Sequence, residues 1–86
     1  MADIQVPANQ WVSAHARAGL PAGVGLLLQN KNPFPVTVQE SQTQPASTSR
    51  DGFLLGYMMA VEVDPDSPGV WLFSHTAPAI LFVQGD

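Results

Sequence analysis

Glycine and proline are spread along the whole chain, and no segment of more than eleven residues is free of both. The chain has 7 glycines and 8 prolines among 86 residues, and the runs between them are short and rich in Val, Leu, Phe and Trp. Both residues interrupt helices, whereas short apolar runs bounded by turns are typical of strands. We therefore predict an all-β fold, a small antiparallel β-sandwich or partly open barrel of six to seven short strands.

The expected strands lie between these interruptions. They are 10–17, 24–29, 34–41, 53–63 with a bend at Gly56, 70–75 and 79–84. Residues 34–41 show the clearest alternation of apolar and polar side chains. The Asn-rich turn at 30–33 is expected to join 24–29 and 34–41 as a hairpin, and residues 64–69 are expected to form a hairpin-type turn.

The segment 10–17 has two interpretations. Its apolar and polar side chains alternate, which indicates a strand, but its Ala and Arg residues also favour a helical turn or two. We predict a strand there.

A chain of this length is one domain. We expect an extended N-terminal arm at residues 1–9 and a β-sandwich domain at residues 10–86. Residues 42–52 are polar and without periodicity, and they are about as long as a loop gets inside a compact domain. Loops of this length are usually functional or disordered, so this loop is the first feature that is not generic.

The composition excludes several classes of function. Three basic residues are too few to bind nucleic acid by neutralising phosphates, and the formal net charge is −4. The absence of cysteine excludes disulfides and a thiolate zinc site. The N-terminus lacks the pattern of a secretory signal, and no apolar run approaches the ~20 residues of a membrane helix. We expect a protein that is made in the cytoplasm and binds neither nucleic acid nor membrane.

No pattern indicates an enzyme. His15 and His75 have no metal-ligand spacing, and each is expected at a polar position of its strand. Residues 64–67 resemble a fragment of a calcium loop, but the acidic ligand near the twelfth position is missing. The serines lack the glycine-flanked elbow of a nucleophile. We predict no catalytic, cofactor-binding or metal-binding residues.

The C-terminal strands are apolar on both faces. Val70 and Leu72 lie on one face of their strand, and Trp71 and Phe73 lie on the other. Either a second subunit covers the outer face, or the domain's own loops do. We prefer the subunit. The interface candidates are Trp11, Leu27, Phe53, Met58, Trp71, Phe73, Leu81 and Val83.

Aromatic side chains allow a different class of function. Trp11, Phe53, Tyr57 and Trp71 could form a flat platform on which sugar rings stack. Aromatic residues in a small β-domain are more often core or interface, so a carbohydrate-binding module is the alternative rather than the main prediction.

Several stretches resemble small β-sandwich proteins of tailed bacteriophage particles. They are GVGLLLQN at 23–30, VTVQES at 36–41 and VWLFS at 70–74, with Pro45 and Gly52 between them. The resemblance covers residues 10–84 and carries no catalytic residue and no cofactor.

The resemblance implies a non-enzymatic virion protein. Identical copies, often trimers, would bind the major capsid protein or another virion protein and stabilise the shell as a decoration or cement protein. The loop 41–52 and the arm 1–10 would be the parts that reach a neighbour. A tail or fibre connector and the soluble carbohydrate-binding module remain the alternatives.

Overall fold

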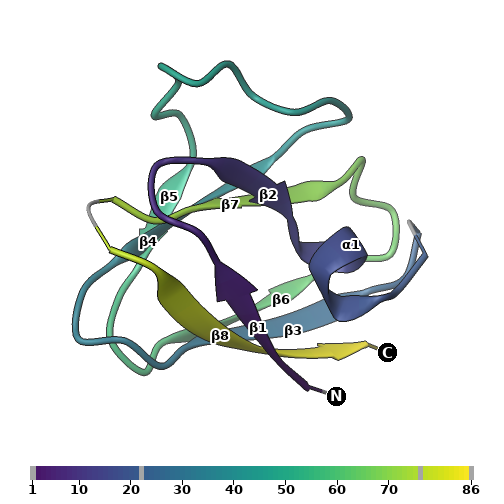
Figure 1. Ribbon diagram of the computed structural model, residues 1–86. Coiled ribbons are helices and arrows are strands. Elements are labelled where there is room, and N and C mark those ends of the chain that lie inside the picture. Colours follow the sequence, from purple (N-terminus) through teal and green to yellow (C-terminus); the bar gives the residue numbers. More distant parts are fainter. Residues whose placement is uncertain (1, 22, 76, 86) are drawn as a thin grey trace.

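The computed structural model describes residues 2–21, 23–75 and 77–85, and these residues form eight strands and one short helix (Figure 1). The elements are β1 (Ala2–Val6), β2 (Trp11–Ser13), α1 (Ala14–Ala18), β3 (Leu26–Asn30), β4 (Val36–Glu40), β5 (Phe53–Leu55), β6 (Ala60–Val63), β7 (Val70–Phe73) and β8 (Ala79–Gly85). The predicted small all-β sandwich is confirmed, with eight strands in place of six to seven.

The strands form two antiparallel sheets packed face to face. Their orders are β1-β8-β3-β6 and β2-β7-β4-β5. The pairs β1–β8, β2–β7, β3–β6 and β4–β5 are all hydrogen-bonded, so the chain is one long hairpin whose tip is the connection between β4 and β5. The pairs β3–β8 and β4–β7 wrap this hairpin into the sandwich. This arrangement is the eight-stranded jelly roll.

The core lies between the two sheets and consists almost entirely of aliphatic side chains. Each strand of the sandwich turns alternate residues inward, as the twofold period of a strand requires. The fully buried members include Val6, Leu26, Leu28, Val36, Val38, Leu72, Leu81 and Val83. Fully burying one such side chain contributes roughly 1.5–3 kcal/mol.

The predicted hairpin between 24–29 and 34–41 is wrong. β3 pairs with β6 and β8, whereas β4 pairs with β5 and β7, so the two strands belong to different sheets. The buried Asn30 directs this crossing, because its amide nitrogen donates to the carbonyl oxygens of Phe34 (2.9 Å) and Leu55 (2.7 Å). Its amide oxygen accepts from the backbone nitrogen of Asn32 at 2.8 Å.

Two other turns also cross between the sheets. The segment 53–63, expected as one bent strand, is divided into β5 and β6, which lie in different sheets. Residues 64–69 join β6 to β7 and are not a hairpin turn. Among the described strands, only β4 and β5 are consecutive in sequence and paired in the same sheet.

The N-terminal segment is a strand rather than an extended arm. β1 pairs with β8 from Ala2 to Val6, and Ile4 and Val6 are buried in the core. Because this strand forms an edge of the first sheet, it cannot serve as an arm to a neighbour without opening the sandwich.

The predicted strand at 10–17 is only partly a strand. β2 ends at Ser13, whose hydroxyl oxygen accepts from the backbone nitrogen of Ala16 (3.2 Å) and caps α1. Gly19, with φ at 72°, ends the helix in the left-handed region. The helix packs against β1, β2 and β7 and closes this side of the sandwich (Figure 1).

Candidate functional site

The histidines and the acidic residues are the side chains that could serve metal or acid–base chemistry. The described residues contain no group of three or more His, Asp or Glu side chains that could hold a metal ion. His15 is buried, and its Nε2 donates to the carbonyl oxygen of Val24 at 2.8 Å. His75 packs edge-on against the ring of Phe73, and its Nε2 lies 3.4 Å from the hydroxyl of Thr37. Each histidine therefore lies against other residues of the fold.

An aromatic cluster covers the outer face of the second sheet. The rings of Trp11 and Phe73 lie 5.2 Å apart, and the guanidinium of Arg50 lies 4.2 Å from the centre of the Phe73 ring. Arg50 is held in place because its Nη1 donates to the carbonyl oxygens of Ser47 and Ser49. The outer aromatic residues are thus covered by a cation from the chain's own loop.

Hydrogen bonds hold the rest of this loop on the sheet. Trp71 donates from its indole nitrogen to the carbonyl oxygen of Ser41 at 3.0 Å, and Gln44 donates from its side chain to the carbonyl oxygen of Trp11 at 3.0 Å. The loop 41–52, which runs from the end of β4 toward β5, therefore covers the strand β7. The outer face of β7 could have been covered by a second subunit or by the domain's own loops. In the structure, the loop 41–52 covers it.

The predicted interface residues fall into three groups. Trp11 and Phe73 are buried beneath the loop, and Leu81 and Val83 are buried in the core. These four are corrected as protein-interface residues, because they are already buried within the folded chain.

Two of the remaining candidates are only half-accessible. Leu27 and Trp71 are half-buried, Leu27 on the outward side of β3 and Trp71 beside the loop. Phe53 and Met58 are exposed.

Five exposed apolar residues lie close together in sequence, in β5 and in its connection to β6. We call them the apolar corner: Phe53, Leu54, Tyr57, Met58 and Met59. The side chains of Leu54 and Tyr57 are 62% and 65% exposed. Sequence reasoning included Phe53 and Met58 but missed the other members as interface residues, because it interpreted 53–63 as one buried strand. The sequence feature that could have indicated the missed residues was the apolar run on both sides of Gly56.

Hydrogen bonds anchor the backbone of the apolar corner at Met58 and Met59. The backbone nitrogen of Met58 donates to the carbonyl oxygen of Asn30 at 2.8 Å, and the carbonyl oxygen of Met58 accepts from the side chain of Gln29 at 3.2 Å. The carbonyl oxygen of Met59 accepts from the backbone nitrogen of Asn30 at 3.0 Å. Met58 also has a φ of 59°, a left-handed conformation that a residue with a long side chain rarely adopts. Strained conformations of this kind persist only where surrounding contacts fix them.

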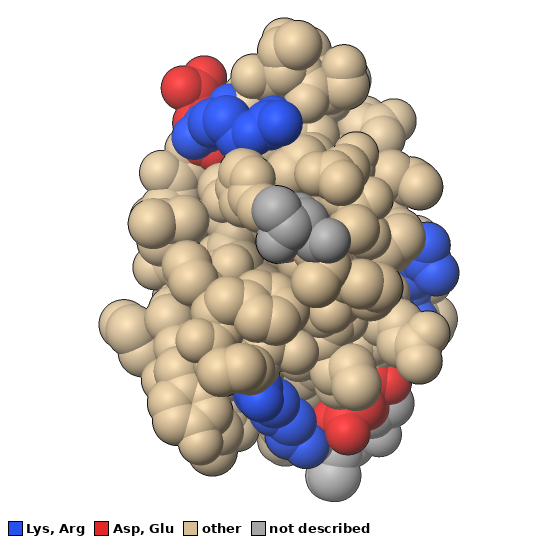
Figure 2. All heavy atoms as spheres, turned by 60° about the vertical axis from the view of Figure 1, so that its left-hand side comes forward, with Lys and Arg blue, Asp and Glu red and all other residues tan. Residues whose placement is uncertain are grey.

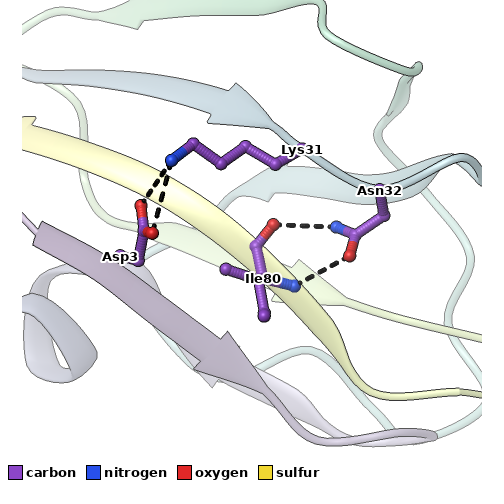
Figure 3. Close-up of polar contacts among 4 residues, drawn as sticks. All are labelled: Asp3, Lys31, Asn32 and Ile80. Carbon is purple, nitrogen blue, oxygen red and sulfur yellow. Dashed lines mark hydrogen bonds and ion pairs between the residues drawn. The ribbon is translucent and has the colours of Figure 1, made fainter.

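Polar contacts hold the neighbouring turn against the first sheet (Figure 3). Lys31 forms an ion pair with Asp3 of β1 at 3.0 Å. The side-chain amide of Asn32 bonds both backbone groups of Ile80, donating to its oxygen at 2.8 Å and accepting from its nitrogen at 3.1 Å. The amide of Asn32 thus continues the hydrogen bonding of β8 where β3 has ended.

Charged side chains are sparse on the surface next to these turns. Figure 2 shows the face that comes forward from the left-hand side of Figure 1, and its Lys, Arg, Asp and Glu side chains lie near the margins. The described surface between them is uncharged. Only 12% of all residues are charged, about half the usual fraction. Such a surface has few strongly hydrated groups that would oppose contact with another protein.

A pocket of about 290 Å³ lies between the β1–β2 turn and the loop 41–52. Its wall is formed by Asn9, Gln10, Trp11, Gln44, Pro45 and Ser47. The pocket and the apolar corner share no residue, so the described surface offers two different kinds of contact site.

Comparisons with known proteins give the chain no relative. No protein-family model matches it, and no curated protein and no solved structure is significantly similar to it. Within the described residues there is also no helix with the length and apolar character needed to cross a bilayer.

Proposed function

We propose that this chain is a non-enzymatic structural protein of a tailed-phage virion, which oligomerises and binds the capsid surface to stabilise the shell. The apolar corner is the observation that carries the proposal. The jelly roll adds support by analogy of fold, since viral capsid proteins use it, although lectin domains and cupins do so as well.

The exposure of the apolar corner suits a protein contact. Its five side chains are 42–65% exposed. Phe53 and Leu54 are consecutive residues of the edge strand β5 and face opposite sides of the sheet, so a partner would have to wrap around this edge to contact both. A standard interface buries about 800 Å² on each partner. The corner would supply the apolar part of such an interface, and the polar surface around it would supply the rest.

The anchored backbone around Met58 and Met59 favours binding. Ordering a side chain or loop at an interface costs roughly 0.5–1.5 kcal/mol for each immobilised side chain. The bonds from Gln29 and Asn30 already fix the backbone around Met58. A partner therefore meets a preformed apolar surface, and less conformational entropy is lost on binding.

Stabilisation of a shell would follow from mass action. A protein that binds only the assembled shell shifts the equilibrium toward that shell, and the effect grows with its free concentration. No covalent or catalytic step is required.

The experiment is to add the purified protein to capsids of the phage that encodes it, prepared without it, and to measure cosedimentation and the temperature at which the shells open. We expect the wild-type protein to cosediment and to raise that temperature. The double variant Leu54→Ser/Tyr57→Ser should keep its fold, because both side chains are exposed, and should bind at least about tenfold more weakly.

The matched control is Ile80→Ser, which removes an exposed apolar side chain outside the apolar corner. It should bind as the wild type does. Wild-type protein that remains in the supernatant would reject the proposal, and equal losses in both variants would reject the corner as the binding surface. Cosedimentation with isolated tails in place of capsids would favour the connector.

The sugar-stacking platform has less support than the apolar corner. Trp11 is buried and Trp71 is half-buried, so of the residues considered for stacking only Phe53 and Tyr57 are exposed, and both belong to the corner.

A further inference from the structure

The pocket beside Trp11 has a wall without charged residues. Three of its six residues are carboxamides (Asn9, Gln10 and Gln44), one is a serine, and none carries a charge. The nearest cation of the same loop, Arg50, is engaged with Phe73 and with two backbone carbonyls. The electrostatic character of this wall suits a neutral ligand, because a charged ligand would find no ion partner there.

The carboxamides have unused hydrogen-bonding groups. Within the described residues, the side chains of Asn9 and Gln10 make no hydrogen bond, and Gln44 uses only its nitrogen, toward Trp11. Each carboxamide presents a donor and an acceptor on neighbouring atoms. This pairing matches two adjacent hydroxyl groups, each of which can donate and accept.

The indole nitrogen of Trp11 gives a second, independent indication of a ligand. Trp11 is 3% exposed, and its Nε1 is a buried donor with no hydrogen-bond partner in the part of the chain that the structure describes. Buried tryptophan N–H groups usually have a partner, and leaving one unpaired costs about 1–3 kcal/mol. Trp71 shows the usual case, since its N–H donates to Ser41.

We propose that this pocket binds one residue of a neutral, hydroxyl-rich glycan. The carboxamides of Asn9, Gln10 and Gln44 bond the hydroxyl groups. The N–H of Trp11 is sealed beneath the wall in the ligand-free chain, and it donates to an oxygen of the ligand once the wall opens. A pocket of about 290 Å³ is at the lower end for small ligands, which suits a single sugar unit of a longer chain. Recognition is by hydrogen bonds rather than by stacking, because the Trp11 ring is covered. The inference does not depend on the capsid proposal, which uses other residues.

The two tryptophans allow a direct test. The ¹⁵N-labelled protein is titrated to millimolar concentrations with glucose, galactose, mannose and N-acetylglucosamine, with their short oligomers, and with the acidic sugars glucuronic and sialic acid. We expect the Trp11 indole N–H signal to shift and to saturate with at least one neutral sugar. The Trp71 signal is the internal reference and should stay in place.

Variants assign the effect to the pocket. Trp11→Phe removes the unpaired N–H and should weaken sugar binding by about tenfold or more, whereas Trp71→Phe removes an N–H outside the pocket and should leave it unchanged. Gln10→Ala changes an exposed wall residue and should also weaken binding if Trp11→Phe fails to fold. No shift with any neutral sugar, a shift with acidic sugars alone, or unchanged binding in Gln10→Ala would overturn the proposal.

Discussion

Asn30 shows how one polar side chain can decide the path of a chain between two sheets. It is completely buried, yet its amide is bonded on both sides, to Phe34 and Leu55 through nitrogen and to Asn32 through oxygen. A buried polar group without partners would be costly, so these bonds specify where β3 must end and the chain must cross. The backbone of Asn30 also bonds Met58 and Met59, so the same residue positions the apolar corner.

The replacement Asn30→Ala should therefore lower the free energy of unfolding by about 2–4 kcal/mol, because one buried and one partly buried carbonyl oxygen lose their donor. Urea denaturation followed by circular dichroism measures this loss. The control is Gln42→Ala, an exposed residue of the loop that makes no hydrogen bond within the described residues and should change stability by less than about 0.5 kcal/mol. A loss below about 1 kcal/mol in Asn30→Ala would contradict this role.

Among the elements, the loop 41–52 has a structural role, because it covers the outer face of the second sheet. It is polar in sequence, but its main chain and Arg50 lie over the aromatic side chains of β2 and β7. The domain thereby hides its second apolar surface without a partner subunit. Among the described residues, the large apolar side chains that stay exposed are those of the apolar corner and Ile80.

The replacement Arg50→Ala tests this cover. It removes the cation from the Phe73 ring and the bonds that shape the loop, and should lower the free energy of unfolding by about 1–2 kcal/mol. Tryptophan fluorescence should shift to the red in the folded state, because Trp11 and Trp71 lie under or beside the loop.

The matched control for Arg50→Ala is Arg17→Ala. Arg17 is an exposed arginine whose side chain makes no hydrogen bond, ion pair or ring contact with another described residue. Equal, small effects of the two replacements would show that the loop does not depend on Arg50.

The sequence predicted the fold class and most strand positions, because Gly and Pro mark the turns and the apolar alternation marks the strands. It did not predict which strands pair. Alternation in 34–41 shows that Val36 and Val38 face inward. These side chains would be buried whichever strand paired with this one, so the alternation does not identify the partner strand. The crossing after Asn30 depends on bonds to Leu55, which is distant in sequence.

The candidate sites were less predictable for the same reason. The pocket brings Asn9 and Gln10 against Gln44, and no local pattern relates the two segments. The outward residues of β7 were correctly distinguished from the inward ones, but the sequence could not show that Arg50 would lie over Phe73.

For the whole molecule, the nested pairing places the first and last described strands side by side. β1 and β8 are antiparallel neighbours, and Ala2 at the start of β1 is paired with Val83 of β8 (Figure 1). A circular permutant with the ends joined by a short glycine-rich linker is therefore feasible.

We expect a permutant opened between Asp66 and Ser67 to fold with a loss of at most about 2 kcal/mol, because that turn is largely exposed. A permutant opened between Asn32 and Pro33 should lose more, because the bonds of Asn30 join the two sides of that break. Thermal unfolding of the two permutants gives the order, and the reverse order would contradict the role of the β3–β4 turn.

The nested pairs also have a consequence for synthesis on the ribosome. β4 and β5 can pair as soon as both have emerged, and each further pair, β3–β6, β2–β7 and β1–β8, then closes only a short additional loop. The first strand to be made has to wait for the last, so β1 stays unpaired until residues 79–85 have left the exit tunnel. The nascent chain is therefore expected to gain its structure from the middle outward, and protease protection of β1 should appear only at the final stage.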